Sequence, residues 1–345
     1  AGDNGAVSDD AESPRDAGTV VWAVLNPVAK RYAVARHSLE RACADAGLPA
    51  PHVLTTTPDG GGYAEARRAL AHGARTVIVG GGDGTVRAVA RALAGTGVEL
   101  GILPLGTANL FAFNLGLRTR DPRLMVDRAL FGIPVAHDVG WASWREIDDG
   151  RAGPPTPPQP FLVMAGLGHD AATVLATGPD AKARLGWASY LARGVRHLGS
   201  APLSMRVSVD NAPARRLRTW TVLVANCGII PGGIEIFPGA RPDDGYLECL
   251  EVPIRTPTQW ASIAWAGITR HRWHAAALRY SRVRTLWAVP DDPAPLHLDG
   301  DVVGMVADLR VRVQPAALLV RRPPDTDAGD RPRALQTLRT QINPE

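Results

Sequence analysis

The sequence predicts a two-part molecule, with an α/β domain followed by an antiparallel β-rich domain. The chain has 345 residues, which is enough for two domains that each bury their own core. From Thr19 to about Asp138, short apolar runs alternate with helical periodicity, a pattern typical of βαβ units and a parallel sheet. Beyond this point short strands with alternating polarity take over. The predicted domains are residues 19–138 and 139–323, with a flexible tail at 1–18 and a polar tail at 324–345.

Four apolar, β-branched runs are the candidate strands of the first domain, and helices fill the intervals. In the third helix the apolar residues recur at i, i+3, i+4 and i+7, which marks one buried face. Loops at the carboxyl ends of such strands gather at one edge of the sheet, where ligands bind. The strands are Val20–Leu25, Val53–Thr55, Thr76–Val79 and Leu100–Leu103; the helices are Val34–Ala46, Tyr63–His72 and the segment with Val86, Val89, Ala90 and Leu93.

The second domain is predicted to be an antiparallel sandwich or barrel. Met205–Asp210 turns Met and Val inward and Arg, Ser and Asp outward, and Leu309–Val313 sets Leu and Val against Arg in the same way. Gly150–Pro160 contains five prolines, so we expect an exposed loop that lies outside the sheet. Further candidates are the strands Arg218–Ala225 and Tyr246–Val252 and the helices Ala181–His197 and Pro257–His274.

The composition excludes several classes of protein. A hydrophobic content of 45% with 21% charged residues is that of a globular enzyme and is too apolar for a disordered chain. The net charge of +4 comes without a concentrated Lys/Arg run, so no nucleic-acid-binding arm is expected. Cys43, Cys227 and Cys249 are widely spaced, which favours buried thiols in a reducing compartment over a metal cluster.

We expect neither a signal peptide nor a transmembrane segment in this sequence. Ala1–Gly18 is acidic and Gly-rich without an apolar stretch, so it reads as a tail. The most apolar stretches, Phe161–Gly168 and Trp260–Thr269, are much shorter than the roughly 20 residues that span a bilayer. We expect a cytoplasmic protein.

The strongest local motif is the glycine-rich turn Gly80–Thr85, which directly follows a predicted strand and precedes an amphipathic helix. Glycines allow the backbone to approach a polyphosphate, and the first N–H groups of a helix favour negative charge. Asp83 could orient a magnesium-bound nucleotide or the attacking group. The motif has neither the P-loop spacing nor the dinucleotide pattern, and a tight turn with an ordinary helix cap remains the alternative.

Two more polar loops are expected at the same sheet edge. Asn26-Pro27 ends the first strand, and the segment Pro104–Asn109 ends the fourth strand before a new helix. Taken singly, Asn26 and Thr107 are ordinary capping residues. Because three strand ends meet at one edge, these loops together favour a ligand site.

With these motifs in order, the sequence resembles the bacterial diacylglycerol kinase and lipid kinase family, which is related to sphingosine and ceramide kinases. The resemblance covers Val20 to about Arg321. It implies a phosphofructokinase-like (NAD kinase-like) α/β domain, a C-terminal antiparallel β-sandwich domain and an active site between them. The matching motifs are Leu25–Pro27, Gly81–Thr85, Leu103–Asn109, Ala165–Ala171, Pro242–Tyr246 and Leu298–Asp301.

The resemblance also implies roles for single residues. The ATP phosphates would lie on the turn Gly81, Gly82, Asp83, Gly84 and Thr85, and the rest of the nucleotide site would comprise Asn26, Pro27, Thr57 and Thr107, with Thr57 chosen among Thr55, Thr56 and Thr57.

Asp301, where many members of the family carry Glu, would act as the base that deprotonates the lipid hydroxyl, with Asp83 as the second catalytic residue. Without the resemblance, Asp299-Gly300-Asp301 reads as a surface β-turn. A structural Mg²⁺ would be held by the Asp244 carboxylate and the backbone carbonyls of Arg241 and Tyr246.

Four positions depart from the family pattern, namely Ala88, Leu110, Phe113 and His169. The main hypothesis is an ATP- and Mg²⁺-dependent lipid kinase that phosphorylates diacylglycerol or a related lipid. The alternatives are a kinase of sphingoid or ceramide-type lipids, an NAD kinase, and a non-catalytic nucleotide- or lipid-binding regulator.

A lipid substrate makes peripheral membrane contact a further expectation, and the resemblance makes a homodimer plausible. Arginines and tryptophans in the two candidate helices could form an interfacial surface, although ordinary packed helices with solvated arginines are the alternative. The residues are Arg193, Arg196, Arg270, Arg272, Trp187, Trp260, Trp265 and Trp273.

Overall fold

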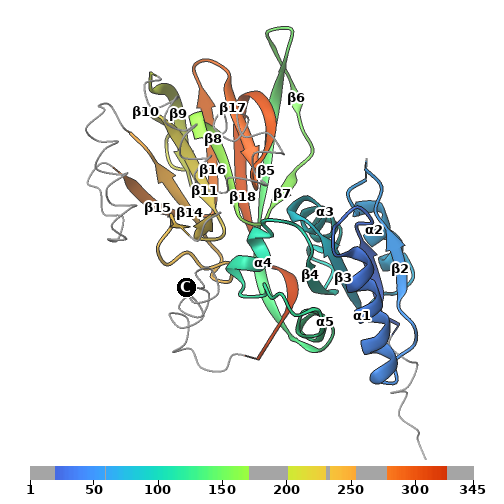
Figure 1. Ribbon diagram of the computed structural model, residues 1–345. Coiled ribbons are helices and arrows are strands. Elements are labelled where there is room, and N and C mark those ends of the chain that lie inside the picture. The colour runs from blue at the N-terminus through green and yellow to red at the C-terminus, as the bar shows by residue number, and fades with distance from the viewer. Residues whose placement is uncertain (1–19, 59, 171–200, 231–233, 254–277, 325–345) are drawn as a thin grey trace, which may run out of the picture.

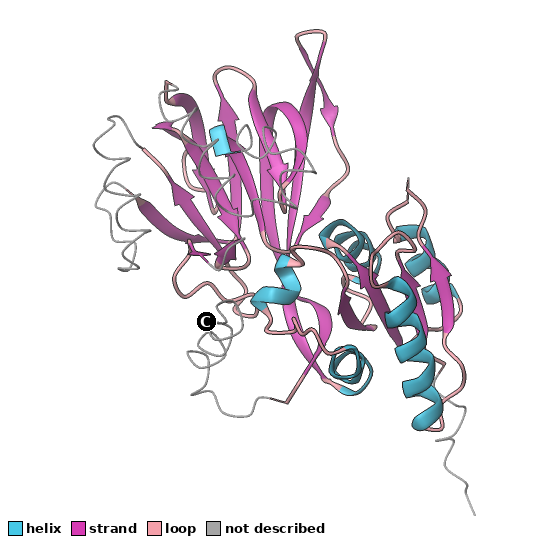
Figure 2. Ribbon diagram, in the orientation of Figure 1, coloured by secondary structure: helices cyan, strands magenta, loops and turns pink. Residues whose placement is uncertain are grey.

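The computed structural model describes residues 20–58, 60–170, 201–230, 234–253 and 278–324, and these form two lobes (Figure 1). Helices are concentrated in one lobe, whereas the other consists almost entirely of strands (Figure 2). Both tails, the two helices predicted in the second domain and the Arg/Trp cluster on them lie outside the described residues. Within the described ranges, no helix has the length and hydropathy needed to cross a membrane.

The α/β lobe is a parallel sheet in the order β4-β3-β1-β2, with helices on both faces. α1 and α5 pack on one face against Ile78 and Leu103, and α2 and α3 cover the other face against Val77 and Val79. The predicted strands and helices of this half are confirmed, with small shifts at their ends. The elements are β1 Trp22–Leu25, α1 Tyr32–Asp45, β2 His52–Thr55, α2 Tyr63–Ala71, β3 Thr76–Gly81, α3 Asp83–Leu93, β4 Glu99–Pro104, α4 Leu110–Asn114 and α5 Pro122–Phe131.

The second lobe is an antiparallel sandwich, as predicted. One layer has the order β15-β14-β11-β8-β17-β18, and the other joins β10, β9, β16, β18 and β5. Apolar side chains such as Met205 and Leu286 fill the space between the layers. The strands are β5 Ile133–Asp148, β6 Arg151–Pro155, β7 Gln159–Phe161, β8 Met164–Gly168, β9 Leu203–Val209, β10 Arg215–Thr219, β11 Thr221–Ala225, β12 Ile229–Ile230, β13 Ile234–Glu235, β14 Leu247–Glu251, β15 Arg279–Val283, β16 Thr285–Pro290, β17 Ala294–Leu298 and β18 Asp301–Arg322.

Two long strands join the lobes. β18 is 22 residues long; its first part pairs with β17, its middle with β16 and β5, and its end lies parallel to β4 through Leu319 and Val320. β5 accompanies it from the α/β lobe into the sandwich, so residue 138 lies inside a strand. The predicted division there remains a prediction, and the two lobes share a continuous sheet.

Two expectations for the second domain were wrong in detail. Gly150–Pro160 is not outside the sheet, because β6 and β7 both pair with β5; each is an edge strand, where proline is tolerated since one side needs no ladder donor. Arg218–Ala225 is not one strand, because the chain passes between the two layers at Trp220. There the Trp220 N–H donates to the Val252 carbonyl at 2.8 Å.

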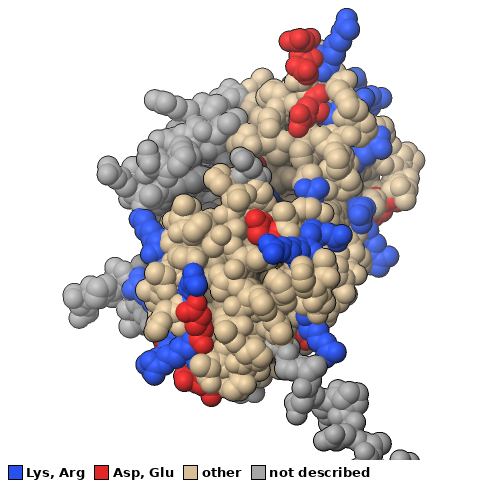
Figure 3. Space-filling model, turned by 90° about the vertical axis from the view of Figure 1, so that its right-hand side faces the viewer, with Lys and Arg blue, Asp and Glu red and all other residues tan. Residues whose placement is uncertain are grey.

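Burial agrees with the sequence pattern at most positions. Met205 and Val207 face the core while Arg206 is exposed, and Cys43, Cys227 and Cys249 are all buried free thiols. Burial raises the pKa of the Cys249 thiol to about 12, which suits an unreactive core residue. On the face that Figure 3 shows, charged side chains lie in scattered groups separated by uncharged surface, so its described part has no continuous basic band for a nucleic acid.

Candidate functional site

The glycine-rich turn after β3 is held by the loop after β4. The Gly81 carbonyl accepts hydrogen bonds from the N–H groups of Leu105 and Gly106 and from the Asn109 side chain, at 2.9–3.1 Å. A Cβ at Gly81 would lie 2.6 Å from the Thr85 Cβ, and one at Gly106 would lie 2.6 Å from the Gly82 Cα. Both positions therefore require glycine, and the two loops form a single rigid unit at the N-terminus of α3.

Asp83 links this turn to α4. Its Oδ1 accepts the Leu110 N–H at 2.5 Å. Leu110 departs from the family pattern in its side chain, but it takes part in the site through its backbone N–H. Burial raises the pKa of the Asp83 carboxyl, although the Leu110 N–H partly offsets this effect. One carboxylate oxygen is thus committed to holding the loop after β4 against the glycine-rich turn.

The remaining predicted nucleotide residues lie at the same sheet edge. The Asn26 N–H donates to the Gly80 carbonyl at 2.8 Å, and its Oδ1 accepts the Val28 N–H at 3.1 Å. Thr57 and Thr107 are exposed beside this edge, whereas Thr56 is buried. The structure therefore brings together Asn26, Pro27, Thr57, Gly81–Thr85 and Thr107, because each follows the end of one of four adjacent parallel strands.

Facing this edge is the tight hairpin between β17 and β18. Asp299 and Gly300 have φ values of 51° and 82°, the positive values that a two-residue type I′ turn requires. The buried Asp299 carboxylate accepts the N–H groups of Leu162, Val163 and Met164 at 2.8–3.0 Å. Burial raises its pKa, and Arg87 together with these N–H groups acts in the opposite direction. The segment is a β-turn, as its sequence alone suggests, and it is fixed to the start of β8.

Arg87 on α3 connects the hairpin to the glycine-rich turn, and sequence reasoning missed it. Its guanidinium donates to the Leu298 carbonyl at 2.7 Å and to Asp301 Oδ2 at 2.8 Å, and it lies 4.0 Å from Asp299 Oδ2. The Asp301 side chain remains 58% exposed. A signal did exist, since Arg87 follows Asp83 by four residues and so lies on the same face of α3.

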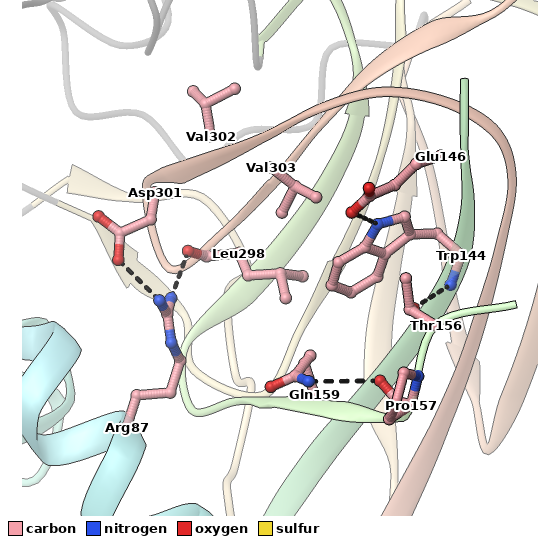
Figure 4. A pocket seen from close by; sticks show the side chains of 10 residues that line it. All are labelled: Arg87, Trp144, Glu146, Thr156, Pro157, Gln159, Leu298, Asp301, Val302 and Val303. Atoms are coloured by element: carbon pink, nitrogen blue, oxygen red, sulfur yellow. Dashed lines mark hydrogen bonds and ion pairs between the residues drawn. The ribbon is translucent and has the colours of Figure 1, made fainter. Parts of the chain in front are cut away.

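A cavity of about 360 Å³ opens beside Asp301 (Figure 4). Asp301 and Arg87 lie at one end, Trp144 and Glu146 at the other, and Leu298 between them. Glu146 Oε1 accepts the Trp144 indole N–H at 3.3 Å. The cavity thus combines apolar walls with carboxylate and amide groups, so it can receive a molecule with both apolar and hydroxyl-bearing parts.

The predicted magnesium residues form a turn in which the Asp244 carboxylate is already paired with an arginine side chain. Arg282 Nη2 lies 2.5 Å from Asp244 Oδ2, and its guanidinium stacks 4.3 Å from the centre of the Tyr246 ring. Arg284 lies 4.6 Å from the same ring, and Arg241 pairs with Asp243 at 3.0 Å. As arranged, the Asp244 carboxylate does not fit a divalent ion, because its Oδ2 is paired with the Arg282 guanidinium and its Oδ1 accepts the Tyr246 N–H at 3.1 Å. The described residues contain no cluster of three or more acidic, His or Cys side chains suited to a metal.

Asp138 is a second residue that sequence reasoning missed. It is buried in β5; its Oδ2 accepts the Gly245 N–H at 2.6 Å, and its Oδ1 accepts the Ala316 N–H at 2.8 Å. It therefore ties β5 both to the turn that carries Asp244 and to a bulge in β18. An aspartate in a predicted strand region, close to Val135, Ala136 and Val139, is the signal that could have revealed it.

Comparison with known proteins agrees with this architecture. Residues 21–142 match the model of the diacylglycerol kinase catalytic domain, and residues 163–322 match that of the YegS C-terminal NAD kinase beta sandwich-like domain. The chain is also similar to proteins described as "Probable lipid kinase YegS-like". For the one from Pseudomonas savastanoi pv. phaseolicola, identity is 32% over 264 residues, covering 75% of this chain and 79% of the relative. For one from Pseudomonas aeruginosa, it is 31% over 280 residues, covering 79% and 84%.

Among solved structures, a diacylglycerol kinase from Bacillus anthracis shares the fold. It superposes with a TM-score of 0.65 at 18% sequence identity, over 91% of this chain and 100% of that chain. At this level of identity the likeness concerns the arrangement of strands and helices only.

Proposed function

Because the chain belongs to the YegS-like family of lipid kinases, we propose that it transfers the γ-phosphate of ATP to the hydroxyl group of diacylglycerol, which gives phosphatidic acid. The observation that carries the proposal is the position of Asp301. Its Oδ2 lies 3.9 Å from where a Cβ on Gly84 would be, so a carboxylate stands directly beside the glycine-rich turn.

The nucleotide side of the proposal rests on the carboxyl edge of the parallel sheet. The N–H groups at the start of the 11-residue helix α3 offer hydrogen bonds and the positive end of the helix dipole to the phosphates. Asn26, Thr57 and Thr107 would contact the rest of the ATP molecule. Mg²⁺ bound to the nucleotide would neutralise phosphate charge, with Asp83 as the acidic group of the turn.

The acceptor side rests on the hairpin and the cavity. A hydroxyl that enters the cavity reaches the exposed Asp301 carboxylate, which accepts the proton as the oxygen attacks the γ-phosphorus, and the bond from that phosphorus to the leaving ADP breaks. Arg87 holds this carboxylate toward α3, so the base and the phosphate donor share one support. The reaction then depends mainly on positioning and charge neutralisation, as is usual in phosphoryl transfer.

Transfer of labelled γ-phosphate from ATP to a panel of diacylglycerol, monoacylglycerol, ceramide, sphingosine and NAD tests the proposal. We expect labelled diacylglycerol, and a loss of about a hundredfold or more for Asp301→Asn and for Asp83→Asn. Asp292→Asn, an exposed carboxylate between β16 and β17, is the matched control and should keep full activity. If only ceramide, sphingosine or NAD is labelled, diacylglycerol is not the acceptor. Full activity of both aspartate variants would contradict the mechanism.

A bilayer-embedded acceptor leads us to propose peripheral contact with an anionic membrane face. Sedimentation with liposomes that contain or lack anionic lipid tests this, and equal recovery in the supernatant would contradict it. Light scattering in solution tests the homodimer that family resemblance suggests.

A further inference from the structure

A chain of buried polar side chains lies beneath the Asp299-Gly300 hairpin, and the proposed reaction does not use it. Its members are Asp170, His297 and Thr221, which are 7%, 2% and 1% exposed. Asp170 follows the end of β8 by two residues, His297 lies in β17 and Thr221 begins β11; in these adjacent strands Gly168 is paired with Thr221 and Gly166 with His297. Three polar side chains therefore meet inside an otherwise apolar layer.

The hydrogen bonds of this cluster converge on the Asp170 carboxylate, from His297 on one side and from Thr221 on the other. The Gly300 N–H donates to His297 Nδ1 at 3.4 Å, so the ring proton belongs on Nε2. His297 Nε2 lies 2.7 Å from Asp170 Oδ2, which accepts that proton, and the Thr221 hydroxyl donates to Asp170 Oδ1. The imidazole thus connects a buried carboxylate to the backbone amide between Asp299 and Asp301.

The backbone of β8 is shaped to admit this pair. A Cβ at Gly166 would lie 2.1 Å from Asp170 Oδ2 and 2.3 Å from His297 Nε2, so any larger residue would displace both side chains. Gly168 has a φ of 133°, which L residues rarely adopt. These requirements account for the two glycines and the aspartate of the segment Gly166–Asp170.

Stability alone does not explain why polar groups occupy this place. Apolar side chains of similar volume commonly stabilise a core as well as a buried carboxylate–imidazole pair does. The hydrogen bonds of Asp170 and His297 instead fix the position of the Gly300 amide. Asp299 holds the other side of the hairpin through the N–H groups of Leu162, Val163 and Met164. The hairpin is therefore held on both sides, and Asp301 leaves it in a defined direction.

We propose that Asp170 and His297 are positioning residues that, through Gly300, set the orientation of Asp301 toward the glycine-rich turn. This inference rests on the proposed function, since Asp301 is the base of that reaction. A shift of about 1 Å in a reacting group can cost on the order of a hundredfold in rate. Loss of the hydrogen bonds made by His297 and Asp170 should therefore reduce kcat.

The test compares His297→Leu, which removes both hydrogen bonds, with His297→Gln, which keeps one donor and one acceptor. We expect His297→Leu to lower kcat for lipid phosphorylation roughly 10- to 100-fold with KM for ATP within about twofold, and His297→Gln to restore much of the loss. Asp170→Ala should match His297→Leu. The double variant should lose no more than the worse single variant, because both act through one chain.

A matched control separates positioning from stability. Thr219→Val removes another fully buried polar group, whose hydroxyl donates to the Thr221 carbonyl at 2.7 Å and accepts the Val252 N–H at 3.1 Å. It should lower the unfolding temperature but leave kcat unchanged, with all assays run well below that temperature. The inference is wrong if Thr219→Val and His297→Leu lower kcat by similar factors for a similar loss of unfolding temperature. It is also wrong if His297→Leu keeps the wild-type kcat.

A second readout needs no catalysis. Nitrogen-15 spectra of protein with labelled histidine should show His297 protonated on Nε2, and Asp170→Ala should change this signal. A proton on Nδ1 in the wild type would overturn the inference even in an active enzyme. A wild type that phosphorylates no lipid of the panel would instead overturn the proposed function, and the positioning role with it.

Discussion

The two sides of the site are assembled in different ways. On the nucleotide side, each polar residue directly follows its own strand, and the parallel register of β1 to β4 makes the loops neighbours. On the acceptor side, the Asp299-Gly300 hairpin is held by groups far away in sequence; Arg87 and Asp301 are 214 residues apart, and Asp299 and Leu162 are 137 apart. Short motifs therefore specify the first side, whereas long-range contacts specify the second.

The largest effect should come from the contact that joins the two sides. Arg87→Met removes the hydrogen bonds to Leu298 and Asp301, so we expect kcat to fall roughly a hundredfold through misplacement of the carboxylate. Arg87→Lys, with a single point charge, should recover only part of the activity. Arg91→Met, one turn further along α3, is the matched control for steady-state kinetics. Full activity of Arg87→Met would mean that the acceptor side needs no support from α3.

The nucleotide side can be tested with two adjacent glycines. In Gly81→Ala the new Cβ would lie 2.6 Å from the Thr85 Cβ, whereas in Gly82→Ala its nearest neighbour would be 3.9 Å away. We expect Gly81→Ala to destabilise the fold by about 1–3 kcal/mol through overpacking, and Gly82→Ala to have a much smaller effect. Urea unfolding would measure both. Equal destabilisation would show that the turn is not fixed by local packing.

The turn that carries Asp244 should show a smaller effect. Arg282 is about half exposed, so Arg282→Ala should cost less than about 1 kcal/mol. Once the guanidinium is removed, added Mg²⁺ should raise the unfolding temperature of the variant while leaving the wild type unchanged. Arg279→Ala, an exposed arginine on β15, serves as the control. An equal rise of the unfolding temperature of the wild type with Mg²⁺ would support the predicted magnesium site as it stands.

The smallest effect should be the pH dependence that Asp83 contributes. Its pKa in the folded protein is raised above the ordinary value of 3.8 by burial, so the folded protein binds a proton more tightly than the unfolded chain. Between these two pKa values, the stability of the wild type should increase as the pH falls, relative to Asp83→Asn. Unfolding temperatures recorded at a series of pH values would reveal the difference, and parallel curves would contradict it.

The same contrast explains what could be predicted from the sequence. The α/β elements and the glycine-rich turn follow from periodicity and local turn chemistry, and the structure brings the predicted nucleotide residues to one edge. Arg87, Asp138 and His297 were not identified, because their roles depend on strand pairing between segments far apart in the chain. The assignment of Gly150–Pro160 to a loop failed for a related reason, since β5 extends far enough to offer an edge on which prolines can lie.

The end of β18 has a consequence for how this protein forms during synthesis. The parallel sheet of the first lobe is completed by Leu319 and Val320, which pair with β4 although they lie more than 200 positions later in the chain. Until the ribosome has released this segment, β4 has no neighbour there and presents an open edge. The sheet of the α/β lobe thus remains unfinished while the residues between β4 and β18 emerge, and the strand that closes its open edge also carries Asp301, which pairs with Arg87 on α3.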